Sequence, residues 1–304
     1  MEYDILIIGG GPAGICAAIY ALRANKKVLL LEKEVVGGKI ISTPFIENYP
    51  GILEIKGMDL SENLNKQVIA FGGEIKMEKV IKIEQIQNKQ QVITTSGKYI
   101  ASAIILATGT KYKRLGIENE EKWIGKGISF CATCDGFFYQ NKVVAVIGGG
   151  NTAVVNALEL AANCKKVYLI QVLEKLTAEP ILINQLEEEK KVEVFYQTSV
   201  KSYIGEEKLE GIELQKGEKI EKLSVEGVFL AIGQIPENEF IEGFIQTNQD
   251  GYIKVDTDFR TNQKGVFAAG DCIEKQVRQL TTAVNDGTIA ALKAIEYLNT
   301  KNKE

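Results

Sequence analysis

Two cysteines separated by two residues give this 304-residue sequence its clearest chemical signal. Cys131-Ala-Thr-Cys134 can supply either a redox-active disulfide or half of a four-cysteine zinc site. No second pair has this spacing, and Cys16, Cys164 and Cys272 stand alone, which argues against zinc. A pair at the start of a helix favours exchange, because the helix N-terminus lowers the pKa of a thiolate. We therefore predict thiol–disulfide exchange at Cys131 and Cys134.

The acidic and basic residues limit both the proton carriers and the partners. Histidine is absent, so proton transfer depends on Asp, Glu, Lys, Tyr or Cys. Asp135 is the acid beside the cysteine pair; the alternative is that it caps a helix. Lys and Arg number 36 against 40 Asp and Glu, a net charge of −4, which offers no general basic field for nucleic acid. We expect no nucleic-acid partner and no bound metal.

The N-terminal part has the pattern of a dinucleotide-binding unit. The apolar run 4–8 leads into Gly9, Gly11 and Gly14, a helical segment follows, and Glu32 ends the next predicted strand. The N-terminus of that helix is suited to a pyrophosphate, and the Glu32 carboxylate to a ribose hydroxyl.

A second unit repeats this pattern but lacks its acidic residue. Gln171 follows Gly148 by 23 positions, as Glu32 follows Gly9. A neutral residue therefore stands where a carboxylate would hold the ribose of NAD. The segment from position 116 to position 259 contains no arginine, so it offers none to bind the 2′-phosphate of NADPH. We favour a nucleotide site that has been lost. The alternatives are NADH bound with the help of Glu174, and NADPH.

The segments around these units predict the layers of the fold. Residues 75–100 indicate antiparallel strands that lead into a buried strand at 103–107, and strand 227–231 follows the second unit in the same way. A final amphipathic helix is predicted at 282–299. We expect an α/β protein with two Rossmann-like nucleotide-binding domains of the three-layer ββα type, the second inserted into the first. The expected boundaries are 1–112 with 245–304 for one domain, and 113–244 for the inserted domain.

These motifs together resemble the low-molecular-weight thioredoxin reductases over nearly the whole chain. The matching segments are Gly9 to Gly14, Gly37-Gly38, Ile46 to Gly51, Ala107 to Gly109, Cys131 to Gly136, and Gly265 to Asp271 followed by Arg278-Gln279. The resemblance implies FAD, held by Gly9, Gly11, Pro12, Ala13, Gly14, Glu32, Gly38, Lys39, Asn48, Val80, Ala107, Thr108, Gly109, Asp271, Arg278 and Gln279. From the residues alone, Asp271 could instead cap the final helix.

The resemblance also implies a division of labour in the cysteine pair. Cys134 would face the flavin, Cys131 would attack the disulfide of thioredoxin, and Asp135 would supply or accept the proton. The domain that carries the cysteines would rotate between the two partners. A homodimer is implied as well.

The chain departs from the family pattern at three places, and the first two concern the electron donor. Where NADPH-dependent members carry a His-Arg-Arg cluster, this chain has Gln171-Val172-Leu173, and an acidic pair after the second glycine motif is replaced by Val155-Asn156. Lys39 replaces a glutamine, and we expect it near the flavin, where it would stabilise the anionic reduced form. The pattern looks like the ferredoxin-dependent flavin thioredoxin reductases. The alternatives are an NADH- or NADPH-dependent reductase and a non-catalytic, redox-sensing flavoprotein.

Two further expectations concern partners and location. Ferredoxins are usually acidic, and a basic cluster that could meet one is formed by Lys111, Lys113, Arg114, Lys122 and Lys126. The apolar run near the N-terminus is too short for a signal or a membrane span. We therefore expect a cytoplasmic protein with no membrane partner.

Overall fold

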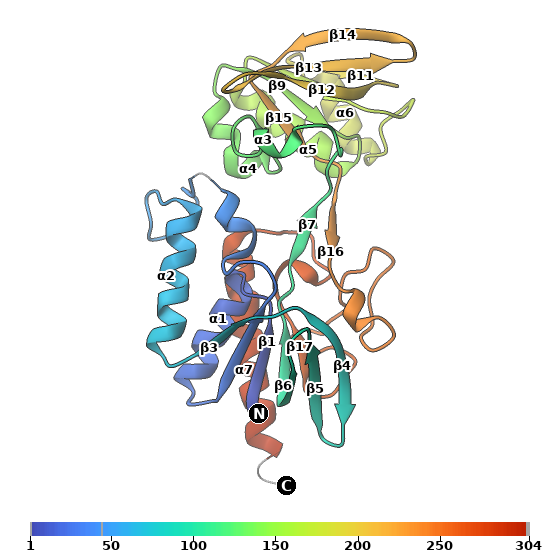
Figure 1. The fold of residues 1–304 in the computed structure, drawn as a ribbon. Helices are drawn as coiled ribbons and strands as arrows, with labels where there is room; N and C mark the ends of the chain where they lie inside the picture. Colours follow the sequence, from blue (N-terminus) through green and yellow to red (C-terminus); the bar gives the residue numbers. More distant parts are fainter. Residues whose placement is uncertain (1, 44, 302–304) are drawn as a thin grey trace. The chain divides into compact units, whose positions relative to one another are not determined.

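The computed structural model describes residues 2–43 and 45–301, which form two compact units (Figure 1). Unit 1 combines Met1–Lys111 with Ile235–Glu304, and unit 2 is Tyr112–Gln234. The chain crosses between the units along β7 (Thr110–Tyr112) and β16 (Gln234–Pro236), which pair with each other. Residues 235–244, expected in the inserted domain, lie in unit 1 because Ile241 packs in its core.

One sheet of seven strands forms the centre of unit 1. Its order is β3-β2-β1-β6-β5-β4, and β17 lies beside β6. The strands next to β1 are parallel to it, whereas β4, β5 and the first part of β6 are antiparallel. The strands are β1 (Glu2–Ile8), β2 (Val28–Glu32), β3 (Glu74–Met77), β4 (Val80–Ile86), β5 (Lys89–Thr94), β6 (Lys98–Leu106) and β17 (Val266–Ala268).

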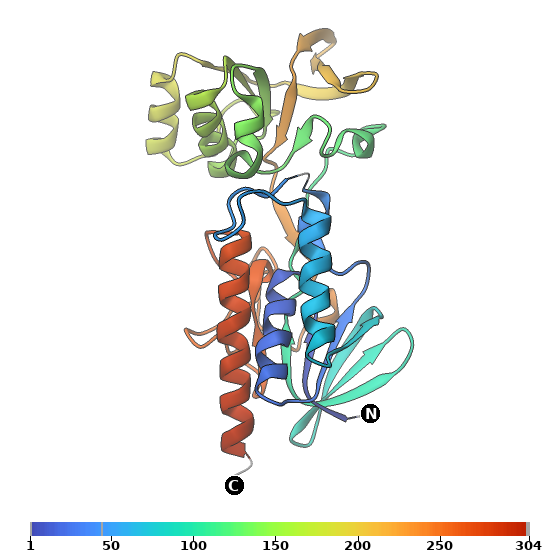
Figure 2. The ribbon, with the colours of Figure 1, turned by 90° about the vertical axis from the view of Figure 1, so that its left-hand side faces the viewer.

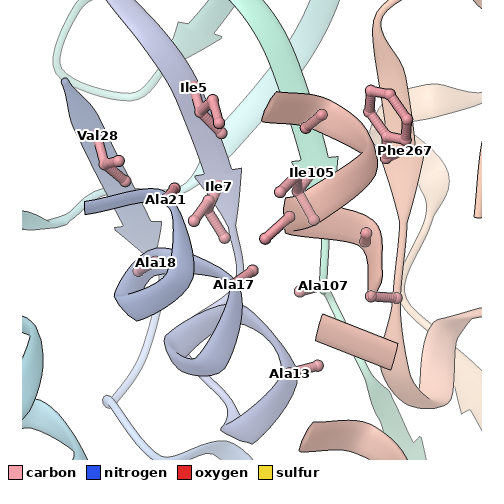
Figure 3. Packing of buried hydrophobic residues seen from close by; sticks show 14 of the residues in the cluster. Ile5, Ile7, Ala13, Ala17, Ala18, Ala21, Val28, Ile105, Ala107 and Phe267 are labelled. Carbon is pink, nitrogen blue, oxygen red and sulfur yellow. The ribbon is translucent and has the colours of Figure 1, made fainter. Parts of the chain in front are cut away.

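Helices cover one face of this sheet and antiparallel strands cover the other. Figure 2 shows α1 (Pro12–Arg23), α2 (Gly57–Ala70) and α7 (Leu280–Lys301) side by side along the first face. The small side chains of Ala17 and Ala18 let α1 pack closely on the strands (Figure 3). On the second face, apolar residues of β4 and β5 cover β1, β2 and β6. These three layers hold the first glycine motif at the carboxyl end of β1.

Unit 2 repeats the three layers on a smaller scale. A parallel sheet in the order β11-β10-β9-β15-β8 has helices on one face and the antiparallel sheet β12-β13-β14 on the other. The parallel strands are β8 (Ile128–Ser129), β9 (Val143–Ile147), β10 (Lys166–Ile170), β11 (Val192–Phe195) and β15 (Gly227–Leu230); the antiparallel strands are β12 (Ser199–Gly205), β13 (Leu209–Lys216) and β14 (Lys219–Ser224). The helices are α3 (Glu120–Trp123), α4 (Ala132–Asp135), α5 (Asn151–Asn163) and α6 (Pro180–Glu188).

The predicted elements agree with the structure at both glycine motifs. The strands before and after each motif form as expected, and the hydrogen bond from Gly9 N–H to the Leu31 carbonyl is matched by one from Gly148 N–H to the Ile170 carbonyl. The expected strand at 103–107 is the second half of β6, which runs on from the antiparallel part without a break. Within the described ranges, no helix is long and apolar enough to cross a membrane.

Candidate active site

The cysteine pair of unit 2 is a disulfide at the start of a short helix. Cys131 and Cys134 are bonded, and Cys131 is the residue that precedes α4. The Cys134 N–H donates to the Cys131 sulfur over 3.2 Å. Both cysteines are half-buried, so a partner can reach them. The pair is therefore in its oxidised form, which can accept two electrons.

Asp135 is a half-buried acid directly after the pair. Its Oδ2 accepts a hydrogen bond from the Ser129 hydroxyl at 2.6 Å, and among the described residues its Oδ1 is buried with no hydrogen-bond partner. Burial raises the pKa of Asp135, and the Ser129 hydroxyl partly offsets that rise. The side chain makes no helix-capping hydrogen bond, so the alternative role of a cap is not supported. A carboxyl group with a raised pKa keeps its proton to a higher pH than a free one, which suits a proton carrier.

The other three cysteines have structural positions. Cys16, Cys164 and Cys272 are buried, and burial raises the pKa of each thiol. The Cys272 thiol donates to the Ala269 carbonyl, and the Cys164 thiol to the Tyr139 carbonyl. None of them has the exposed thiolate that exchange requires.

The first glycine motif of unit 1 is shaped by close backbone contacts. A Cβ on Gly14 would lie 1.9 Å from the Gly9 carbonyl oxygen, and one on Gly9, whose φ is +110°, would lie 2.2 Å from the Ala107 oxygen. These contacts bring the start of α1 against the end of β6. By contrast, no atom lies within 4 Å of a Cβ built on Gly11, and no side chain caps α1. The first turn of the helix is therefore open to an anionic group.

Glu32 lines a cavity beside this motif. Its carboxylate accepts hydrogen bonds from the backbone N–H groups of Gly10, Lys33 and Glu34, at 2.7 to 2.9 Å. The cavity has a volume of about 450 Å³. Four of the expected FAD-binding residues line it, namely Gly9, Glu32, Val80 and Thr108. Its size and its carboxylate suit the adenosine half of a dinucleotide.

A second group of expected residues meets around Asp271. Lys39 binds Asp271 Oδ2 at 2.5 Å and the Thr110 hydroxyl at 2.9 Å, and the Arg278 guanidinium donates to the Asp271 carbonyl oxygen. The Asp271 Oδ1 is buried without a hydrogen-bond partner in the part of the chain that the structure describes. At the start of α7 the Gln279 N–H donates to the Thr282 hydroxyl at 3.1 Å. The charge of Lys39 is balanced by Asp271, which the sequence did not predict.

These features fit FAD. A dinucleotide with a polyol chain needs a site for each of its parts. The uncapped start of α1 suits the pyrophosphate, the cavity lined by the Glu32 carboxylate suits the adenosine, and the Asp271 Oδ1 can accept from the polyol chain. Gly38 also lies close to the motif, since a Cβ on it would be 3.3 Å from the Gly11 Cα.

Two of the expected FAD-binding residues lie outside the cavity and the Asp271 cluster, and several residues that line the cavity were not predicted. Asn48 is exposed in the segment after Ile46, and Gln279 lies at the start of α7. Sequence reasoning did not find Glu78, Thr95 and Phe240, which line the cavity together with Lys33, Lys79, Ile81, Glu237 and Glu239. No motif marks these residues, because they come from four separate segments of the chain.

The second glycine motif, in unit 2, has a neutral side chain where the first motif has the Glu32 carboxylate. Gln171 is buried, and its side-chain amide donates to the Lys175 carbonyl over 3.1 Å. The Thr177 N–H binds the Gly149 carbonyl at 2.7 Å, as the Gly37 N–H binds Gly10 in unit 1. The fold of the loop is thus retained, while its carboxylate has been replaced by a neutral amide.

Two members of the expected basic cluster form ion pairs with acidic side chains. Lys111 forms ion pairs with Glu34 and Glu237, and Arg114 pairs with Glu121. Lys122 lies over the Trp123 ring at 4.3 Å. Lys111 and Arg114 therefore have acidic partners that the sequence did not predict.

A dinucleotide-binding unit and an exchangeable disulfide on one chain define a flavoprotein disulfide reductase. Residues 3–287 match the pyridine nucleotide-disulphide oxidoreductase family, and the chain belongs to that family. It is 37% identical to the thioredoxin reductase of Treponema pallidum, with 98% of each chain covered. The resemblance to thioredoxin reductases is confirmed, and the cofactor is FAD.

Solved structures give the same result for the fold. The thioredoxin reductase of Streptococcus pyogenes has a TM-score of 0.94 and 35% identity, over 98% of this chain and 99% of that one. A ferredoxin-flavin thioredoxin reductase from Clostridium acetobutylicum has a TM-score of 0.54 and 32% identity, with 98% and 99% covered. The expected pair of Rossmann-like domains is confirmed.

Two glycine substitutions should separate cofactor binding from folding. Gly11→Ala is expected to lower the affinity for FAD at least tenfold with the thermal stability of the FAD-free protein unchanged, because its Cβ enters only the open space at the helix start. Gly14→Ala should cost about 1–3 kcal/mol of stability, because its Cβ meets the Gly9 oxygen. Flavin fluorescence titration and thermal unfolding measure the two effects. Wild-type affinity in Gly11→Ala would contradict the assignment of this space to the pyrophosphate.

Proposed function

We propose that this protein is a thioredoxin reductase that takes its electrons from reduced ferredoxin. The electrons pass to FAD in unit 1, then to the Cys131–Cys134 disulfide in unit 2, and finally to the disulfide of thioredoxin. The reductase from Clostridium acetobutylicum, named for both ferredoxin and flavin, supports this donor by its similarity. Each thioredoxin disulfide needs two electrons, so two ferredoxin molecules must bind in turn.

The observation that carries the choice of donor is the surrounding of Gln171. The position that holds the ribose in a nicotinamide site has a buried amide, already bonded to Lys175. The next two residues, Val172 and Leu173, are 64% and 51% exposed and carry no charge for a phosphate. Arg114 is the one arginine in the sequence of unit 2, and it is paired with Glu121. A site without these charges does not favour NADPH or NADH.

Unit 1 provides the FAD site in this proposal. The N-terminus of α1 with Gly11 holds the pyrophosphate, Glu32 the ribose of the adenosine, and Asp271, with Lys39 and Arg278 beside it, the polyol chain. FAD supplies the ability to accept electrons singly and to pass them on as a pair. The proposal also keeps the remaining expected residues, which are Gly9, Pro12, Ala13, Gly14, Gly38, Asn48, Val80, Ala107, Thr108, Gly109 and Gln279.

Unit 2 provides the exchange site. Phe137 and Phe138, just after the disulfide, are 63% and 36% exposed, which suits a protein substrate better than a small disulfide. Cys131 attacks the thioredoxin disulfide, Cys134 then attacks the mixed disulfide, and Asp135 gives a proton to the thiolate that leaves. Rotation about β7 and β16 would let the cysteine pair reach the flavin and thioredoxin in turn.

The proposal also includes a cytoplasmic homodimer. Three buried, unpaired cysteines agree with a reducing compartment. Sedimentation should give twice the mass of the 33.5 kDa chain.

Turnover with different donors tests the function. Oxidised thioredoxin is mixed anaerobically with the holoenzyme and with reduced ferredoxin, NADPH or NADH, and the thioredoxin thiols formed are counted. We expect thiols with ferredoxin and none above background with either nicotinamide. Thiols formed with NADPH or NADH would replace the donor but leave the reductase, whereas none with any donor would refute the reductase itself.

A further inference from the structure

Ser129 holds a hydrogen-bonding position between Asp135 and the main chain of Cys131. It ends β8 and is buried. Its oxygen accepts the Cys131 N–H at 3.1 Å, and its hydroxyl donates to Asp135 Oδ2 at 2.6 Å. The carbonyl oxygen of Cys131 lies 3.4 Å from the same hydroxyl. One hydroxyl proton thus has two acceptors within reach, and it can serve only one at a time.

The two arrangements correspond to the two states of Asp135. When the carboxylate is ionised, Oδ2 can only accept, so the Ser129 proton points to it over the 2.6 Å between the two oxygens. When Oδ2 carries a proton, that proton can be donated to the serine oxygen. The serine proton then turns to the Cys131 carbonyl. No proton is gained or lost in this switch other than the one that Asp135 binds.

We propose that Ser129 is a positioning residue whose hydroxyl couples the main chain of Cys131 to the proton carried by Asp135. This inference rests on the proposed role of Asp135 as the proton donor in thiol–disulfide exchange. The hydrogen bonds of Ser129 join the Asp135 carboxylate to the main chain of Cys131, so it acts through these two neighbours. It stabilises the ionised form of Asp135 and so lowers the pH at which that residue loses its proton.

Other titratable groups near Asp135 do not replace this switch. Tyr139, on the turn after α4, has its pKa raised to about 12 by burial and by the Asp135 charge, so it stays neutral in the working range. Glu159, on α5, accepts from the Thr133 hydroxyl at 2.9 Å and lies at the surface. Cys164 is a buried thiol whose pKa is raised by burial.

The test is the pH profile of a single turnover by pre-reduced holoenzyme with oxidised thioredoxin. The rate should fall as the pH rises through the pKa of Asp135. In Ser129→Ala this fall should move upward by about one pH unit, because a hydrogen bond to the charged form has been removed. Ser202→Ala is the matched control, since Ser202 donates to the Glu213 carboxylate at 2.7 Å elsewhere in unit 2. Its profile should not move.

The outcomes separate the two claims. If Asp135→Asn removes the fall but Ser129→Ala leaves it in place, the inference about Ser129 is overturned and the proposed function stands. If Asp135→Asn keeps the fall, the proton-donor role fails and the inference with it. Should Ser129→Ala not fold, infrared difference spectra of the wild-type protein decide. The carboxyl band that Asp135→Asn removes should have the frequency of a group that donates a hydrogen bond, and the frequency of a free carboxyl overturns the inference.

Discussion

Cys131→Ser and Cys134→Ser should each abolish thioredoxin reduction, with a loss of at least about 1,000-fold, while the flavin is still reduced by its donor. The reason is that exchange needs one thiolate to attack and a second to resolve the mixed disulfide. After reduction, Cys134→Ser should retain the Cys131 thiol and accumulate a covalent adduct with thioredoxin. Cys131→Ser should form none. Non-reducing electrophoresis and anaerobic flavin absorbance measure the two results.

A buried cysteine gives the matched control for these variants. The Cys164 thiol donates to the Tyr139 carbonyl, a hydrogen bond that a serine hydroxyl can also make, so Cys164→Ser should keep wild-type turnover. Substantial turnover in either variant of the pair would show that the disulfide is not on the electron path. An adduct formed by Cys131→Ser alone would reverse the roles of the two cysteines.

Asp135→Asn is expected to slow exchange and to stabilise the protein. The rate at neutral pH should fall by about 100-fold, because the leaving thiolate loses its proton donor. The pKa of Asp135 is raised in the folded protein by burial, so the folded carboxylate is disfavoured relative to the unfolded one. The ionised acid therefore lowers stability at pH values above its folded pKa, and an amide removes that cost.

The pH dependence of this stability effect has a definite sign. The advantage of Asp135→Asn in melting temperature should be largest near pH 8, where the wild-type carboxyl is ionised. It should shrink as the pH falls toward 3.8, the ordinary pKa of the group, because the wild-type acid then becomes neutral too. Glu218→Gln, an exposed acid of unit 2, should change neither rate nor melting temperature. A variant that is slower and less stable at pH 8 would mean that Asp135 acts mainly as an ionised structural residue.

Local patterns in the sequence predict the two nucleotide-type units well. Buried strands and glycine turns are short-range signals, and the repeat of 23 positions between Gly9 and Glu32, and between Gly148 and Gln171, places both strand ends correctly. The disulfide at Cys131 and Cys134 is likewise a local feature.

Contacts between distant segments were not predictable in this way. The ion-pair partners of the basic cluster could not be read from the sequence, because Lys111 pairs with Glu34 and Glu237, which are far from it along the chain. The ion pair of Lys39 with Asp271 likewise joins segments that are distant in the sequence. Such pairs depend on how loops from different strands converge at one edge of the sheet. That convergence is a property of the tertiary structure, and no spacing in the sequence encodes it.

Anaerobic flavin absorbance of the purified yellow holoenzyme tests the central claim most directly. The protein is mixed separately with NADPH, NADH and reduced ferredoxin, and the loss of the oxidised flavin band is followed over time. The account predicts bleaching by ferredoxin alone, because the Gln171 site lacks the charges that a nicotinamide dinucleotide needs. Rapid bleaching by NADPH or NADH would contradict it and would make the second glycine motif a working nucleotide site.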